Sequence, residues 1–150
     1  MIENVHARQV PDAPTLLDRM MELWPADHWP PLRLDRPLGV GADGGHGFVR
    51  YTCTAYEPGA RVEFTFAPGL GLVGTHTLYV VPGGLRHVLR GKATGSMRLW
   101  WPLAIRWLHD ALMEDLFDNA EKAAGRTPAR PVRWSWWVRK LRKFPLRPRG

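Results

Sequence analysis

Residues 74–91 read GTHTLYVVPGGLRHVLRG, two alternating runs separated by a Pro-Gly-Gly turn. Alternation of apolar and polar residues is typical of a half-buried strand, and the turn predicts that the two runs pair as an antiparallel hairpin. A turn at residues 82–83 gives three pairs on one face of the hairpin: Val80 with Leu85, Leu78 with His87, and His76 with Leu89. Two histidines therefore lie diagonally on a face that is otherwise leucine and valine.

The pattern extends outward from this hairpin in both directions. We expect strands at residues 2–10, 47–57 and 61–66, with Val62, Phe64 and Phe66 on one face of the last, and we expect the sheet to end at Pro102. Residues 25–47 are rich in proline and glycine, which predicts a long loop or a very short helix, with a brief strand at 33–35 as a further option.

Helical spacing of apolar residues marks two other segments. It predicts a short helix within residues 15–24 and a long one over 103–124, with Gly125 at the C′ position after the long helix. The predicted fold class is therefore α+β, a curved antiparallel β-sheet wrapped around a long C-terminal α-helix.

The 150 residues suit one folded domain, and the net charge of +7 is unevenly distributed. Residues 126–150 contain nine Lys/Arg and no acidic residue, whereas residues 1–125 carry 12 basic and 14 acidic groups. We therefore expect a domain at 1–125 and a basic, Trp/Pro-rich tail at 126–150 that is disordered or forms an interfacial helix. The single cysteine, Cys53, excludes an internal disulfide.

The tail segment RWSWWVRKLRK has the pattern of an amphipathic helix on an anionic membrane, and nucleic acid is the less favoured partner because the tryptophans gather on one helical face. The absence of an apolar leader or spanning segment predicts a cytoplasmic protein, peripheral on the inner membrane face. The predicted membrane-binding residues are Trp134, Trp137, Arg139, Lys140, Leu141, Arg142 and Lys143.

The order of these elements, with the blocks DRPLGVGADGGHGFVRYTCTAYEPGARVEFTF and PLAIRWLHDALMEDLFDNAE, resembles the SRPBCC superfamily, which includes START-like and polyketide cyclase/dehydrase-like proteins. The resemblance covers about residues 2–124. It implies a helix-grip fold with an apolar cavity between the sheet and the last helix, and members that bind or transform hydrophobic molecules. It supplies no shared catalytic motif, so the catalytic residues stay unknown.

The sequence thus predicts binding of a hydrophobic or amphipathic small molecule, with transport of that molecule as a further possible role. His76, His87 and His109 would supply polar contacts in an apolar pocket, although each could equally be a core histidine bonded to a neighbour. The predicted ligand-binding residues are Phe64, Phe66, His76, Leu78, His87, Leu89, Leu108, His109 and Leu112.

Several other features of the sequence have more than one interpretation. Histidines could hold a metal, but no short ligand-spacing motif is present, so we expect neither metal nor cofactor. The G-x-G-x-x-G match at 39–44 lacks the flanking strand and helix of a dinucleotide site, which favours an entrance loop. We expect Asp110 and Glu114 to form, together with Arg106, a row of charged side chains that faces solvent. The alternatives to a carrier are a cyclase/dehydratase-type enzyme on an aromatic or polyketide-like substrate, in which His76 or His87 moves protons, and a protein-binding module.

Overall fold

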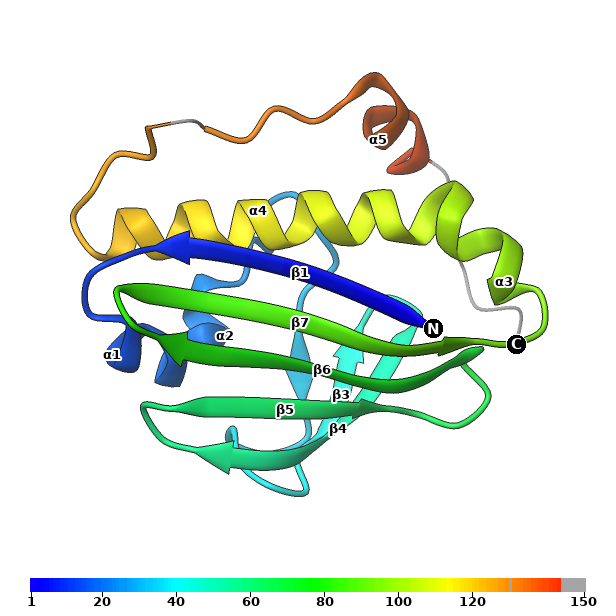
Figure 1. The fold of residues 1–150 in the computed structure, drawn as a ribbon, viewed down its shortest axis with the longest axis horizontal. Helices are drawn as coiled ribbons and strands as arrows, with labels where there is room; N and C mark the ends of the chain where they lie inside the picture. Colours follow the sequence, from blue (N-terminus) through cyan, green and yellow to red (C-terminus); the bar gives the residue numbers. More distant parts are fainter. Residues whose placement is uncertain (130, 144–150) are drawn as a thin grey trace.

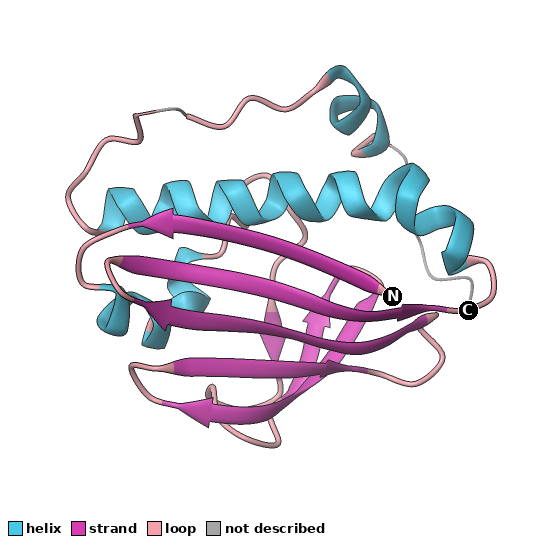
Figure 2. Cartoon of the chain, in the orientation of Figure 1, coloured by secondary structure: helices cyan, strands magenta, loops and turns pink. Residues whose placement is uncertain are grey.

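The computed structural model describes residues 1–129 and 131–143. Within them, seven antiparallel strands form one curved sheet (Figures 1 and 2) in the spatial order β1-β7-β6-β5-β4-β3-β2. The strands are β1 (Ile2–Gln9), β2 (Arg33–Leu34), β3 (Asp43–His46), β4 (Val49–Glu57), β5 (Arg61–Phe66), β6 (Leu72–Val81) and β7 (Gly84–Ala93).

Helical segments close the sheet on one side. They are α1 (Ala13–Asp18), α2 (Met20–Leu23), α3 (Met97–Trp100), the π-helical turn η1 (Trp101–Ile105), α4 (Arg106–Ala123) and α5 (Trp136–Leu141). The segments α3, η1 and α4 follow one another without a break, and α4 lies along the sheet (Figure 1). After α4 the chain runs back beside this helix, and α5 is the last helix in the described residues.

The fold class predicted from the sequence is confirmed: the protein is an α+β helix-grip structure. The register of the decisive hairpin is also confirmed, because β6 and β7 pair Val80 with Leu85, Leu78 with His87, and His76 with Leu89. Phe64 of the sheet and Leu112 and Leu116 of α4 are buried where the sheet faces the helix, so these members of the predicted apolar stripe pack as their spacing predicts. Gly125 adopts a φ of 78° directly after α4, as expected of a C′ residue.

Two local predictions were wrong. The sheet does not continue to Pro102, because β7 ends at Ala93, Gly95 turns the chain with a φ of 56°, and helix begins at Met97. Pro102 lies instead within the π-helical turn η1. Proline has no amide hydrogen to donate, so the regular hydrogen-bond pattern of an α-helix is interrupted there. The loop expected over 25–47 also contains strand β3, whose residues Asp43–His46 pair with Val49–Thr52 of β4.

Glycine permits the close approach of β6 and β7. Gly74 has a φ of 151°, and a Cβ there would lie 2.1 Å from the carbonyl oxygen of Arg90. A side chain at this position would therefore push the two strands apart, away from the register that brings the histidines together.

Candidate functional site

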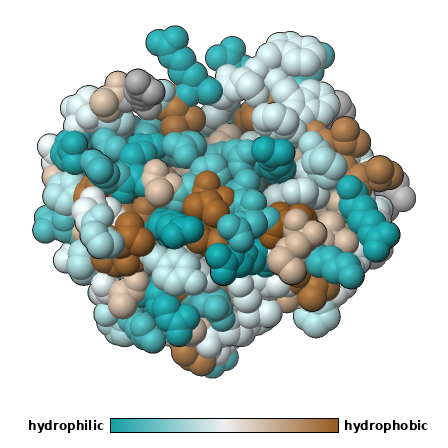
Figure 3. Space-filling view, viewed as in Figure 1, coloured by the Kyte–Doolittle hydropathy of each residue, from teal (hydrophilic) through white to brown (hydrophobic). Residues whose placement is uncertain are grey.

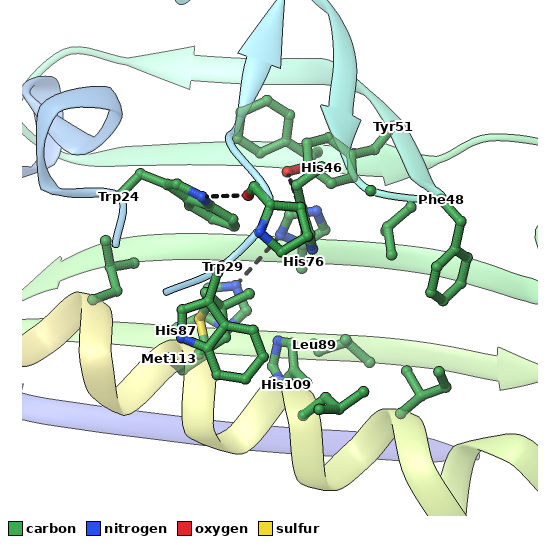
Figure 4. A pocket seen from close by; sticks show the side chains of 18 of the residues that line it. Trp24, Trp29, His46, Phe48, Tyr51, His76, His87, Leu89, His109 and Met113 are labelled. Atoms are coloured by element: carbon green, nitrogen blue, oxygen red, sulfur yellow. Dashed lines mark hydrogen bonds between the residues drawn. The ribbon is translucent and has the colours of Figure 1, made fainter. Parts of the chain in front are cut away.

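A cavity of about 380 Å³ lies between the sheet and α4 (Figure 4). Its wall is mostly apolar and comes from β3 to β7, η1 and α4, with α2, the segment 28–30 and α5 also contributing. All nine residues predicted to bind ligand lie in this wall: Phe64, Phe66, His76, Leu78, His87, Leu89, Leu108, His109 and Leu112. The structure thus brings the predicted set together, while their role in binding stays a prediction.

Five histidines belong to the wall: the three that the sequence predicted, His46, and His28, which is exposed. His76 and His87 form a hydrogen-bonded pair, with 3.4 Å between Nδ1 of His76 and Nε2 of His87. The ring of His109 lies 5.2 Å from that of His87, measured between centroids. The fourth is His46 on β3, whose Nδ1 lies 2.9 Å from the hydroxyl of Tyr51. The sequence did not predict His46 as a site residue, because the glycines around it indicate a loop rather than a strand.

The imidazoles of His46, His76, His87 and His109 are uncharged at neutral pH. Burial lowers the pKa of His46 to about 4. Burial, together with the neighbouring imidazoles, lowers the pKa values of His76, His87 and His109 well below their ordinary value. Burial also raises the pKa of Tyr51, so its hydroxyl stays protonated. The cluster therefore offers neutral donors and acceptors rather than a positive charge.

Several nitrogens of the cluster have no hydrogen-bond partner among the described residues. They are the buried atoms Nε2 of His76, Nδ1 of His87 and Nδ1 of His109. A buried polar atom without a partner costs about 1–3 kcal/mol. His76 and His109 both lie in the cavity wall, so a turn of either ring about its χ2 bond would direct a nitrogen toward the cavity. A polar group of a ligand would relieve this cost.

The tail helix packs over one end of the cavity. Leu141 and Arg142 belong to the wall, and the guanidinium of Arg142 lies 3.8 Å from the ring centroid of Trp134 and 5.2 Å from that of Trp29. Arg142 also donates a hydrogen bond to the carbonyl of His28. The indoles of Trp29 and Trp134 both donate to Asp115, which ties the tail to α4. Arg142 thus adds a positive charge at this end of an otherwise neutral cavity.

The structure separates the predicted membrane-binding residues into two groups. Trp134, Leu141 and Arg142 pack against the domain, as does Val138, which is buried. Trp137 is exposed, although its indole donates to the carbonyl of Leu103, and Arg139, Lys140 and Lys143 are exposed. Arg130 and residues 144–150 of the predicted tail lie outside the described residues. Among those described, no helix is long and apolar enough to cross a bilayer.

A polar seam joins β1 to α4, and it corrects the expectation of a solvated charge row. His6 contacts Asp110 and Glu114, each at 2.9 Å. Arg8 contacts Glu114 at 2.6 Å, Asp118 at 2.7 Å and Glu121 at 3.2 Å. The sequence could not reveal this seam, because it did not predict that β1 pairs with β7 and so faces the helix.

The seam carries charge, unlike the cavity. Burial lowers the pKa of His6, but hydrogen bonds to Asp110 and Glu114 outweigh that effect and raise it to about 9. The same contacts hold the pKa values of both carboxyls below their usual range, against the opposing effect of burial. His6 is therefore an imidazolium at neutral pH, next to the neutral ring of His109.

Comparison with known proteins supports the fold. No protein-family model matches the chain, and no curated protein matches its sequence. A solution structure of a protein from Thermobifida fusca superimposes with a TM-score of 0.56 at 14% identity, covering 85% of this chain and 96% of that chain. The Aha1 dimer from Colwellia psychrerythraea gives 0.51 at 14%, covering 81% and 97%. The solution structure of CalU16 from Micromonospora echinospora gives 0.52 at 11%, covering 94% and 88%. Identities this low show a shared fold alone.

Proposed function

We propose that this protein binds one hydrophobic or amphipathic small molecule between the sheet and α4. The observation that carries this proposal is the cavity itself, an apolar space of about 380 Å³ with four neutral histidines in its wall. Small-molecule sites typically have volumes of about 300–1,000 Å³ and a few polar groups in apolar walls. The helix-grip fold shared with the Aha1 and CalU16 structures supports membership of the SRPBCC superfamily, whose resemblance implies the same class of function.

The wall suggests how such a molecule is held. Its apolar part would contact Leu78, Leu89 and Leu112, while a neutral polar end, such as a hydroxyl or carbonyl, would bond to His76 or His109. An acidic head group is disfavoured beside the histidines because none of the four carries a positive charge to offset its desolvation. It would be better placed at the other end of the cavity, beside Arg142.

A titration with the dye 1-anilinonaphthalene-8-sulfonate tests the binding site. We expect saturable binding of one dye per chain, competed by decanol, because both molecules are amphipathic and small enough for the cavity. Leu108→Trp places a larger side chain at the cavity wall and should abolish this binding. Val73→Trp, at a position 65% exposed on β6, is the matched control and should bind normally. Equal dye binding by both variants would place the dye elsewhere and refute the proposal.

We further propose that the protein docks on an anionic membrane surface. Six exposed side chains form what we call the apolar rim: Leu99, Trp100, Leu103, Trp107, Trp136 and Trp137. The hydrogen bond from Trp137 to Leu103 joins the α5 part of this rim to the η1 part. Figure 3 shows apolar and hydrophilic surfaces side by side at the edge where α3 lies. Tryptophan favours the headgroup level of a bilayer.

Basic side chains accompany the apolar rim and argue for anionic lipid. Arg106 stacks on Trp107 and Lys140 on Trp136, at 5.5 and 4.2 Å from the ring centroids. Each basic residue near such a surface contributes about 1 kcal/mol. The apolar rim also lies next to the cavity. Trp101, Ile105 and Leu141 line the cavity and belong to η1 and α5, which also carry residues of the rim. Docking through the apolar rim would therefore bring the cavity close to the bilayer.

Vesicle sedimentation tests this docking. Binding to phosphatidylcholine vesicles should rise strongly when phosphatidylglycerol is included. Arg139→Glu/Lys140→Glu should lower that binding by at least roughly thirtyfold, the equivalent of about 2 kcal/mol. Arg86→Glu/Lys92→Glu makes the same charge change at exposed positions of β7 and should have a smaller effect. Equal losses in the two variants would show a general charge effect, and binding of RNA in place of vesicles would identify a different partner.

One observation favours an enzyme as the second candidate. His76 and His87 are neutral, adjacent and hydrogen-bonded, so one ring can accept a proton while the other donates one. A cyclase/dehydratase-type reaction at an enolisable carbon would use this pair. Deuterium incorporation into a 1,3-diketone, followed by NMR, should then be accelerated by the protein and fall by about 10²–10⁴ in His76→Phe. No acceleration by the unmodified protein would leave binding as the function.

A further inference from the structure

Three potential metal ligands meet where β1 crosses α4. His6 comes from β1, and His109 and Asp110 are consecutive on α4. One ligand atom of each residue, two imidazole nitrogens and a carboxylate oxygen, lies within 4.8 Å of the others. Ligand atoms around one Zn²⁺ ion lie roughly 3–3.5 Å apart, given bond lengths of about 2.0–2.2 Å. Small side-chain rotations would therefore bring the three atoms to bonding distance.

Two buried atoms without partners border the same place. Nδ1 of His109 and Oδ1 of Asn4 have no hydrogen-bond partner among the described residues. The amide nitrogen of Asn4 donates to Oδ1 of Asp110 at 2.8 Å, so its unpaired oxygen lies beside the same carboxylate. A cation, or a water molecule bound to one, would satisfy both atoms. This observation is independent of the ligand spacing.

A second carboxylate orients the histidine on β1. Nδ1 of His6 lies 2.9 Å from Glu114, whose other oxygen accepts a hydrogen bond from Arg8. Donation from Nδ1 to a carboxylate aims Nε2 of the same ring at the metal, as in the carboxylate–histidine–zinc arrangement. Nε2 of His6 already points at Asp110, at 2.9 Å. The metal would displace the hydrogen between them, which leaves to solvent as a proton.

We propose that His6, His109 and Asp110 bind a divalent transition-metal ion of the zinc class. Two imidazoles and a carboxylate suit such an ion, and three protein ligands leave a coordination position open. His109 also belongs to the cavity wall, so the ion would lie at the boundary of the cavity, within reach of a polar group there. No local motif reveals this site, because His6 lies about a hundred residues before His109 and Asp110 in the chain.

The site does not depend on the proposed hydrophobic ligand, and the metal alone tests it. Isothermal titration of the purified chain with ZnCl₂ should show one ion bound per chain at micromolar or lower concentration. His109→Gln and Asp110→Asn should each weaken binding by at least roughly tenfold. His28→Gln alters an exposed histidine beside Asp27 and should bind Zn²⁺ as the unmodified protein does.

A second readout uses the unmodified protein and so does not depend on the variants folding. One equivalent of CoCl₂ should give the visible absorption of a four- or five-coordinate site, and its paramagnetism should broaden the imidazole NMR signals of His6 and His109 but not those of His28. Binding of Zn²⁺ that survives both His109→Gln and Asp110→Asn, or Co²⁺ that broadens His28 alone, would overturn the proposal. Failure to bind any metal would overturn it as well.

Discussion

His76 and His87 lie on neighbouring strands with Nδ1 of the first 3.4 Å from Nε2 of the second. Both rings are neutral, so each carries one N–H group. Whichever ring donates across the pair, the two outer nitrogens have opposite character, one a donor and the other an acceptor. The pair therefore matches a polar group that can both accept and donate, such as a hydroxyl.

Removing this pair should favour the fold and weaken the binding of a polar-headed ligand. His76→Phe/His87→Leu replaces two polar rings, each with an unpaired buried nitrogen, by apolar side chains, a change that is neutral or stabilising when both partners go. We expect a urea midpoint no lower than that of the unmodified protein, and affinity for decanol reduced roughly tenfold, the equivalent of about 1.4 kcal/mol. A markedly destabilised double variant would instead assign the pair a structural role.

Acid should destabilise the protein partly through His46. Its pKa is about 4 in the folded state and about 6.5 when unfolded. Above pH 6.5 the ring is neutral in both states. As the pH falls from 6.5 to 4, the unfolded chain takes up a proton that the folded protein does not, so the free energy of unfolding falls by up to about 1.4 kcal/mol per pH unit. Urea titrations should show a shallower decline for His46→Gln; parallel curves would mean that this ring is not buried as described.

The seam between β1 and α4 should contribute strongly to stability. Arg8→Met leaves the carboxylates of Glu114, Asp118 and Glu121 without their shared partner. We expect the free energy of unfolding to fall by about 3 kcal/mol, because removing one side of a largely buried ion pair leaves uncompensated charge. Arg19→Met removes the partner of Glu22 in an exposed pair and should cost less than about 1 kcal/mol. Similar small losses in both variants would show that the seam is as solvated as the surface pair.

The tail should control access to the cavity. Trp134→Ala removes the ring on which Arg142 stacks and the hydrogen bond to Asp115. Losing both contacts should loosen α5 and speed release of the naphthalene dye roughly tenfold in stopped-flow experiments, with little change in the sheet. Trp136→Ala alters an exposed tryptophan of the same helix and should leave release unchanged. Equal release rates in both variants would show that the tail does not cover the entrance.

The sequence predicted what depends on local pattern. Period-two alternation and a Pro-Gly-Gly turn were enough to pair His76 with Leu89, and helical spacing placed Leu112 toward the sheet. Strand alternation and helical spacing each depend only on which residues share a face of one element. Together these patterns were enough to predict residues of the cavity wall.

The features that the sequence did not predict depend mostly on contacts between segments that are distant in the chain. The pairing of β1 with β7, which brings His6 to α4, has no local signal. His46 sits among glycines that match a loop, and its strand forms only because β4 pairs with it. The helical turn at Met97 was hidden by the apolar run that follows the last strand, where strand and helix patterns look alike.

A crystal structure determined under xenon pressure would show whether the interior of the protein is a ligand cavity, as we propose, or a solid core. Xenon enters apolar cavities that no water fills. We expect electron density for xenon, or for a co-purified molecule, between the sheet and α4, in contact with Leu78, Leu89 or Leu112. Side chains that close this space, with neither xenon nor a bound molecule between them, would contradict this proposal.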